Sequence, residues 1–204
     1  MEIKEKINKY FDNELIITLS NEHGLSVNNL RSSIYFSVLA TIHQMKLRSQ
    51  DSGVALMFYN MSKVAAGSKV KRNLLAFFYK HFRYQGIINF TKTLFNDSLP
   101  QIEKMLQERF NLSEYVSNRI LIMTSVGTFS ILGENILEKK LTMEEFREIL
   151  NLKLPLYREA ISCDLNFPFE HWEANKADLQ NQIIRAENRI KLRAKRKFFF
   201  LRSN

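Results

Sequence analysis

The residues best suited to binding chemistry are crowded into the last twenty positions of this 204-residue chain. Eight basic side chains stand there against one acid, Glu187, so this segment holds seven of the nine net positive charges of the protein. The basic residues are Arg185, Arg189, Lys191, Arg193, Lys195, Arg196, Lys197 and Arg202. The apolar residues beside them are Phe198, Phe199, Phe200 and Leu201. The pattern predicts a surface for an anionic or apolar partner, carried by the tail and not by the body.

Three kinds of partner fit this tail. In the simplest interpretation the tail is a solvated helix end whose phenylalanines dock on the body of the protein or on a second copy of the chain, and a protein partner would bury them in the same way. Nucleic acid would release counterions on meeting the basic side chains, and its bases would stack on the aromatic rings. An anionic membrane surface would attract each lysine or arginine by about 1 kcal/mol and accept the rings at its interface. We expect protein binding or self-association first, nucleic acid second and a reversible membrane tether third.

The rest of the chain has no pattern typical of an enzyme. The single cysteine, Cys163, has no partner for a metal-binding or redox motif, and Gly53 and Gly67 stand alone, so no phosphate-binding loop is present. The histidines have no metal-ligand spacing relative to one another and stand at His23, His43, His81 and His171. We therefore expect a non-enzymatic interaction or scaffold protein, with no cofactor, no metal site and no small-molecule substrate.

The composition indicates a helical, globular body. Hydrophobic residues make up 45% of the sequence, which is enough for a sizeable core. Six glycines and three prolines are few for a fold rich in sheets. The first nine residues are charged and polar, unlike an apolar leader, and one cysteine excludes an intramolecular disulfide. These features favour a cytoplasmic location.

The body is organised around a motif that occurs twice, 87 residues apart. In each copy an amphipathic helix is followed by a turn residue, a leucine, a serine and a long apolar helix. Gly24 and Asn111 suit the left-handed conformation that ends a helix. Ser26 and Ser113 suit the N-cap of the helix that follows. The sequence thus predicts two pseudo-repeated helix hairpins, at about residues 13–62 and 100–150.

Further helices are expected around these hairpins. Asp51 or Ser52 begins one whose apolar side includes Leu56. A basic and aromatic segment, residues 69–84, is expected to end at Gly86 and to bury its aromatic residues.

Three other local patterns predict helix starts and ends. Apolar residues at helical spacing predict a helix over residues 2–11. Asn96, Asp97 and Ser98 are expected to form a loop and to cap a helix that has Pro100 in its first turn. Thr142 and Glu145 have the spacing of a capping box, which opens a helix through Leu150.

The most membrane-like stretch is residues 120–132. Its thirteen residues are too few to cross a bilayer, which takes about 20 apolar residues, so a buried core helix is expected. Gly127 and Gly133 in this stretch are expected to let a neighbouring helix approach closely.

The expected fold class is all-α, a helical bundle of the two pseudo-repeated hairpins with a long C-terminal basic helix. The domain boundary is placed in residues 163–168, which divides a helical domain, 1–162, from a basic helical extension, 163–204. Trp172, Leu179 and Ala186 are seven apart, so the extension has one apolar seam at heptad-like spacing.

At the two motif copies the sequence resembles the YidB-like bacterial proteins, a family catalogued as a domain of unknown function. The resemblance covers roughly residues 15–137. It is carried by Ser20, Asn21, Gly24, Leu25, Ser26, Ser32, Ser33, Ile34, Asp51, Ser52, Gly53 and Leu56, and by 116–132 in the second copy. It implies an all-α fold of paired helix hairpins, and it brings no established reaction, cofactor or catalytic residue.

Overall fold

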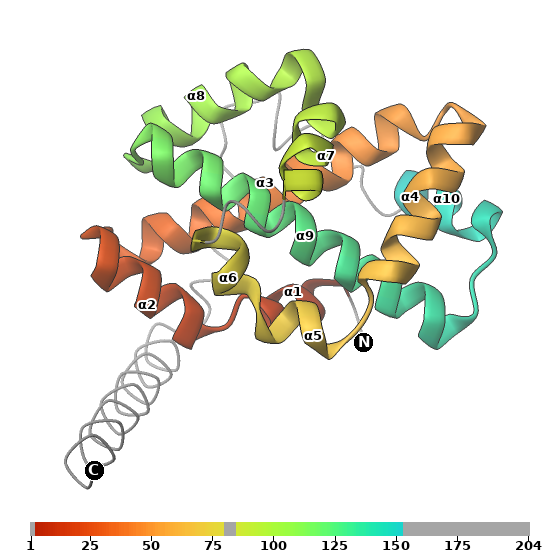
Figure 1. The fold of residues 1–204 in the computed structure, drawn as a ribbon, viewed down its shortest axis with the longest axis horizontal. Helices are drawn as coiled ribbons and strands as arrows, with labels where there is room; N and C mark the ends of the chain where they lie inside the picture. Colours follow the sequence, from red (N-terminus) through yellow and green to blue (C-terminus); the bar gives the residue numbers. More distant parts are fainter. Residues whose placement is uncertain (1–2, 80–84, 153–204) are drawn as a thin grey trace, which may run out of the picture.

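The computed structural model describes residues 3–79 and 85–152, and within these ranges every regular element is a helix and none is a strand (Figure 1). The expected all-α class is therefore confirmed. In chain order the elements are α1 (Ile3–Tyr10), α2 (Asn13–His23), α3 (Val27–Arg48), α4 (Ser52–Ala65), α5 (Ser68–Arg72), α6 (Leu74–Tyr79), α7 (Gln85–Phe95), the short 3-10 helix η2 (Asn96–Ser98), α8 (Leu99–Phe110), α9 (Glu114–Lys139) and α10 (Met143–Leu152).

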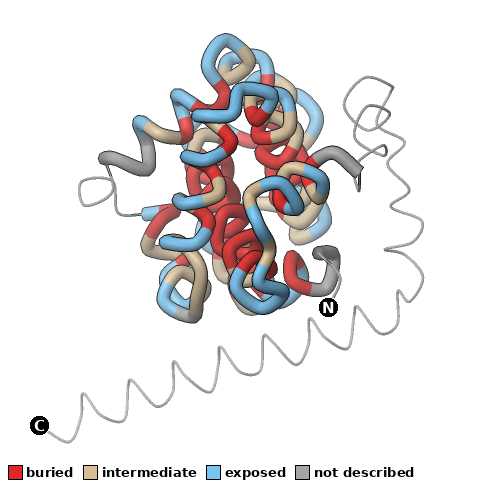
Figure 2. The backbone as a smooth tube through the Cα atoms, turned by 90° about the vertical axis from the view of Figure 1, so that its right-hand side faces the viewer, coloured by how far each residue is buried: buried red, intermediate tan, exposed pale blue. Residues whose placement is uncertain are grey.

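Helix α9 forms the centre of the fold. Helices α1, α3, α4, α5, α6, α7 and α8 all pack against it. Every residue from Arg119 to Gly133 is buried, and Figure 2 shows the buried backbone gathered inside an exposed outer layer. A helix that is apolar all round is stable only where other elements cover it. The expectation of a buried core helix at residues 120–132 is confirmed.

The length of this core helix exceeds the sequence-based estimate. Helix α9 has 26 residues, because helical structure extends on both sides of the apolar stretch. Among the described helices it is the one with the length and apolar composition to cross a bilayer. Of its most apolar stretch, however, 89% is buried inside the protein. Its apolar surface is therefore matched by the surrounding helices.

Two glycines of α9 allow the close approaches that the sequence predicted. A Cβ atom built on Gly133 would lie 1.8 Å from the backbone oxygen of Ser62 on α4. One built on Gly127 would lie 2.5 Å from Cζ of Phe11. Glycine inside a helix costs roughly 1 kcal/mol relative to alanine. Here that cost is offset by the packing of α4 and of Phe11 directly on the α9 backbone.

Both predicted turns have the expected geometry. Gly24 and Asn111 adopt left-handed conformations, with φ of 63° and 52°. The Oγ atoms of Ser26 and Ser113 accept hydrogen bonds from backbone N–H groups three residues later, as N-caps of α3 and α9. The backbone oxygen of Ser20 accepts from the N–H groups of residues 24 and 25, and that of Gln107 does the same for residues 111 and 112.

The prediction for α4 was right about its start and wrong about one face. Asp51 is the N-cap, and its Oδ1 accepts a hydrogen bond from the N–H of Val54 at 2.9 Å. Phe58 is fully buried, but Leu56 is 48% exposed. Successive residues of a helix are about 100° apart. Leu56 therefore lies nearly opposite Phe58 and points away from the core.

The described part of the basic and aromatic segment, residues 69–79, forms two short helices, α5 and α6, which meet at Asn73. The side chain of Asn73 donates a hydrogen bond to the backbone oxygen of Lys69, which closes α5. Leu74 and Phe78 are buried, as expected. The prediction that Gly86 ends this segment was wrong. Gly86 lies in the first turn of α7, where backbone N–H groups have no intrahelical partner and a missing side chain is tolerated.

Two predicted caps had different outcomes. Ser98 makes no cap hydrogen bond; its backbone is helical, so η2 leads directly into α8, and its Oγ accepts from Nε2 of Gln44 at 3.1 Å. Pro100 does stand in the first turn of α8. The capping box at the start of α10 is confirmed, because Glu145 Oε2 accepts from the N–H of Thr142 at 2.7 Å and Thr142 Oγ1 accepts from the N–H of Glu145 at 3.2 Å.

The predicted domain boundary at residues 163–168, and the extension 163–204 with its heptad-like seam, lie outside the described residues.

Candidate functional site

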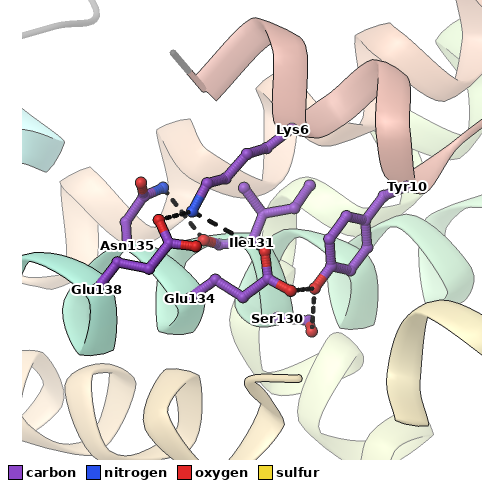
Figure 3. Close-up of polar contacts among 7 residues, drawn as sticks. All are labelled: Lys6, Tyr10, Ser130, Ile131, Glu134, Asn135 and Glu138. Atoms are coloured by element: carbon purple, nitrogen blue, oxygen red, sulfur yellow. Dashed lines mark hydrogen bonds and ion pairs between the residues drawn. The ribbon is translucent and has the colours of Figure 1, made fainter. Parts of the chain in front are cut away.

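The binding residues predicted from the sequence all belong to the C-terminal tail. The basic set from Arg185 to Arg202 and the apolar set from Phe198 to Leu201 lie outside the described residues. The structure instead reveals a polar cluster that the sequence did not indicate, at the contact between α1 and the C-terminal half of α9 (Figure 3). We name it the α1–α9 clamp; its members are Lys6, Tyr10, Ser130, Glu134 and Glu138.

The spacing of these residues along two helices brings them together. Lys6 and Tyr10 are four residues apart on α1 and point toward α9 (Figure 3). Ser130, Glu134 and Glu138 follow one another at intervals of four on α9. Residues four apart share one face of a helix. Two single faces, one from each helix, therefore supply every side chain of the clamp.

The basic end of the clamp is a buried lysine between two carboxylates. The Lys6 side chain is 0% exposed, and its Nζ donates a hydrogen bond to Oε2 of Glu138 at 2.6 Å. Oε2 of Glu134 lies 3.9 Å from the same Nζ. A buried ammonium group is costly unless it is paired and hydrogen-bonded. The two glutamates supply this pairing for the buried Lys6.

The other end of the clamp is the phenol of Tyr10. Its hydroxyl donates a hydrogen bond to Oε1 of Glu134 at 2.6 Å and shares a second hydrogen bond with Oγ of Ser130 at 2.9 Å. Glu134 contacts both Lys6 and Tyr10, so it joins the two ends. Asn135, beside it, donates to the backbone oxygen of Ile131 at 3.1 Å and belongs to the helix's own hydrogen bonding.

The pKa values at the two ends of the clamp are shifted in opposite directions. The hydrogen bond from Lys6 lowers the pKa of Glu138, with the charge of Lys6 acting in the same direction. Burial raises the pKa of Tyr10 well above its ordinary value, and the hydrogen bond to Glu134 raises it further. At neutral pH the clamp therefore contains a charged carboxylate at Glu138 and a protonated phenol.

The clamp is suited to holding two helices together. Lys6 and Tyr10 of α1 each bond to a glutamate of α9, and Tyr10 also bonds to Ser130. Within residues 3–79 and 85–152, no group of three or more histidine, cysteine or acidic side chains is placed to hold a metal ion. The α1–α9 clamp is therefore a charged, hydrogen-bonded contact between two helices.

Four buried hydroxyl groups of α3 and α9 are likewise used within the fold, whereas the buried Oγ of Ser62 on α4 has no hydrogen-bond partner. On α3, Ser37 donates to the backbone oxygen of Ser33 and Thr41 donates to that of Ser37, each at 2.8 Å. On α9, Thr124 and Thr128 donate to backbone oxygens four residues earlier, each at 2.7 Å. Such bonds satisfy a hydroxyl where the surroundings are apolar.

Two histidines lie in the described ranges, and they have different surroundings. His23 packs against Phe78, with ring centroids 5.3 Å apart, and lies 6.3 Å from the ring of Tyr115. His43 on α3 is half-buried; burial lowers its pKa, and the charge of Lys46 lowers it further. His43 is therefore a partly buried residue of the helix surface.

One sequence signal could have indicated that Lys6 is buried. Lys6 lies three residues after Ile3 and four before Tyr10, so it falls on the apolar stripe of α1. A charged residue on an apolar stripe requires a buried partner. The sequence does not show which acids approach it, because Glu134 and Glu138 are more than 120 positions away.

Comparison with known proteins gives no relative: the chain matches no protein-family model, no curated protein and no solved structure. The resemblance to the YidB-like family therefore stays a prediction.

Proposed function

We propose that this chain is a non-enzymatic interaction protein, whose helical body carries the basic C-terminal segment to a protein partner or to a second copy of the chain. The observation that carries the proposal is the distribution of charge: residues 185–204 hold seven of the nine net positive charges and three consecutive phenylalanines. A segment of this composition favours contact with another surface, because its positive charges attract an anionic partner at long range and its apolar rings are stabilised by burial.

The state of the polar groups in the body supports this proposal. The α1–α9 clamp joins Lys6, Tyr10 and Glu134 to one another, and the buried hydroxyls of α3 and α9 return to their own helices. Catalysis requires polar groups directed at a substrate. In the described part of the body, the side chains of the clamp bond to one another, and the hydroxyls of Ser37, Thr41, Thr124 and Thr128 bond to the backbone of their own helices.

We further propose that the body is a bundle built from a duplicated unit, α2–α3 and α8–α9, ending in a long basic helix. The matching caps at Gly24 and Asn111, and at Ser26 and Ser113, support the duplication. Membership of the YidB-like family and a cytoplasmic location belong to the same proposal.

Light scattering on the full chain tests the leading function. The variant to compare has Phe198, Phe199, Phe200 and Leu201 replaced by serine, which keeps the charge and removes the apolar rings. We expect the mass of the unmodified chain to rise above 24.1 kDa with concentration, while the variant stays at that mass. Equal masses at all concentrations would remove self-association through these residues.

Nucleic-acid binding is the second candidate, and it is favoured by the density of positive charge between Arg189 and Arg202. Counterion release makes such binding fall steeply with salt. A full-length variant with the eight basic residues replaced by glutamine should lose affinity for an RNA or DNA oligomer at low salt. The same pair of proteins, spun with anionic and with neutral vesicles, tests the membrane alternative; equal recovery with both vesicle types would reject an electrostatic tether.

A further inference from the structure

One face of α4 is apolar and exposed. Leu56, Met57 and Val64 are 48%, 38% and 87% exposed. Leu56 and Val64 are eight residues apart and Met57 and Val64 seven, so the three side chains line one side of the helix, opposite the buried Phe58, with the exposed Asn60 between them. We call this surface the outer face of α4. Elsewhere in the described ranges, exposed large apolar side chains are scattered over α3, α6 and the two ends of α9.

Such a concentration of apolar surface marks a contact. Single exposed apolar residues are ordinary on protein surfaces, but three on one helix face expose enough hydrocarbon to favour a covering element. The burial of such a side chain is favourable in proportion to the apolar area removed from water. The covering element must therefore be apolar itself, and it must lie within reach of α4.

The chain itself leaves the described body next to α4. Helix α10 packs on α4 and α3, with the rings of Tyr59 and Phe146 at 5.8 Å. Further along α10, Nη2 of Arg147 donates to the backbone oxygen of Gln50, just before α4 begins. The sequence then continues for 52 residues beyond Leu152.

The composition of the next part of the chain matches the outer face. Residues 154–172 contain four charged residues and eight large apolar ones: Leu154, Leu156, Tyr157, Ile161, Leu165, Phe167, Phe169 and Trp172. This composition contrasts with the basic segment that begins at Arg185. The distance is also suitable, since residues 153–163 span up to about 36 Å when extended, whereas α4 is about 21 Å long.

We propose that residues 154–172 of the same chain cover the outer face of α4. This intramolecular contact shields Leu56, Met57 and Val64 from water and leaves the basic residues 185–204 free to meet a partner. It is independent of which partner the tail binds. A second copy of the chain is the competing occupant, and the test below separates the two.

The single native cysteine makes a direct test possible. Cys163 lies within the proposed covering segment, so Val64→Cys adds one possible disulfide to the full-length protein. A disulfide forms readily only where the two Cα atoms come within about 7 Å. The matched control is Lys104→Cys. The Lys104 side chain is 72% exposed, and its helix, α8, lies on the opposite side of the molecule from α4 in Figure 1.

Under mild oxidant at low protein concentration, we expect Val64→Cys to form an intramolecular disulfide at least tenfold faster than Lys104→Cys. Non-reducing electrophoresis and peptide mass mapping measure the product. Equal rates for the two variants would overturn the proposal. Covalent dimers through Val64→Cys, in place of a linked monomer, would overturn it in favour of a second copy on this face.

A protease measurement tests the same contact without a disulfide. Val64→Glu places a charge on the outer face, and Leu137→Glu does so at a comparable exposed site on α9, where Leu137 is 53% exposed. We expect tryptic cleavage after Arg158 to be several-fold faster in Val64→Glu than in Leu137→Glu. Equal cleavage rates in the two variants would contradict a cover formed by residues 154–172.

Discussion

The Nζ atom of Lys6 lies 2.6 Å from Oε2 of Glu138, although 132 positions separate the two residues in the chain. This contact, with the hydrogen bond of Tyr10 to Glu134, attaches the first helix to the central one. The attachment is charged and directional, unlike the apolar packing that holds most of α9. It therefore makes specific predictions for single substitutions and for pH.

Removal of the carboxylate partner should cost more than removal of both partners. Glu138→Ala leaves Lys6 buried with a carboxylate oxygen only at 3.9 Å, and we expect a loss of about 1–2 kcal/mol. The figure is modest because Glu138 is 56% exposed and solvent screens the pair. Urea unfolding measures the free energy.

The matched variants for this prediction are Lys6→Met and the double substitution. Methionine fills the volume of lysine without burying a charge. The double variant should therefore be more stable than Glu138→Ala alone. A double variant that is less stable by the sum of the two single effects would show that the ion pair contributes nothing.

Acid should weaken the clamp at Glu138. The pKa of this carboxyl is lower in the folded protein than its ordinary value of 4.5. The unfolded chain therefore binds the proton first, so the contribution is complete above pH 4.5 and is lost as pH falls through the lower, folded pKa. Glu138→Gln should show a smaller loss of stability between neutral pH and acid than the unmodified protein. The same loss in both proteins would contradict the assignment.

Alkali should weaken the clamp at Tyr10. Its pKa is raised from an ordinary value of 10.0, so the folded protein retains the phenol proton that the unfolded chain loses. The contribution is complete below pH 10 and declines as pH rises toward the folded pKa. Tyr10→Phe should lose the hydrogen bonds and with them this alkaline decline. Thermal unfolding between pH 9 and pH 11 measures the difference; parallel curves would count against it.

The two close-packed glycines should differ in their response to alanine. At Gly133 the new Cβ would meet the backbone of Ser62, which cannot move without shifting α4, so we expect a loss of about 3 kcal/mol. At Gly127 it would meet Cζ of Phe11, and a small shift of this one side chain requires less rearrangement than a shift of a helix backbone, so the loss should be smaller, about 1–2 kcal/mol. Denaturant midpoints of the two variants measure the order. The reverse order would contradict the close approach of α4 to α9.

The duplicated turns should respond alike. Ser26→Ala and Ser113→Ala each remove an N-cap hydrogen bond and should each cost about 1 kcal/mol. Asn111→Gly should be neutral or slightly stabilising, since glycine adopts the left-handed conformation without a steric penalty. Gly24→Ala should be destabilising for the same reason. Unequal effects of the two serine variants would argue against equivalent turns.

Local features of the fold were predictable because their causes are local. The left-handed residues at Gly24 and Asn111, the caps at Ser26, Asp51 and Ser113, and the capping box at Thr142 involve residues within a few positions of each other. The predictions were wrong where a contact with a residue distant in the sequence determines the local structure. The Oγ atom of Ser98 accepts a hydrogen bond from Gln44 on α3 and does not cap α8, and nothing in the sequence indicates that partner.

The clamp was not predictable in full for the same reason. The place of Lys6 on an apolar stripe shows that it is buried, but its partners come from the far end of α9. The outer face of α4 was concealed in another way. Leu56 is apolar and adjacent to core residues in sequence, so periodicity alone assigned it to the core.

Light scattering of three full-length proteins tests most directly where the chain meets its partner: the unmodified protein, the clamp variant Lys6→Met with Glu138→Ala, and the tail variant with Phe198 to Leu201 replaced by serine. We predict that the first two assemble alike as concentration rises and that the tail variant remains at 24.1 kDa. Assembly that persists in the tail variant and disappears in the clamp variant would contradict the proposed role of the tail.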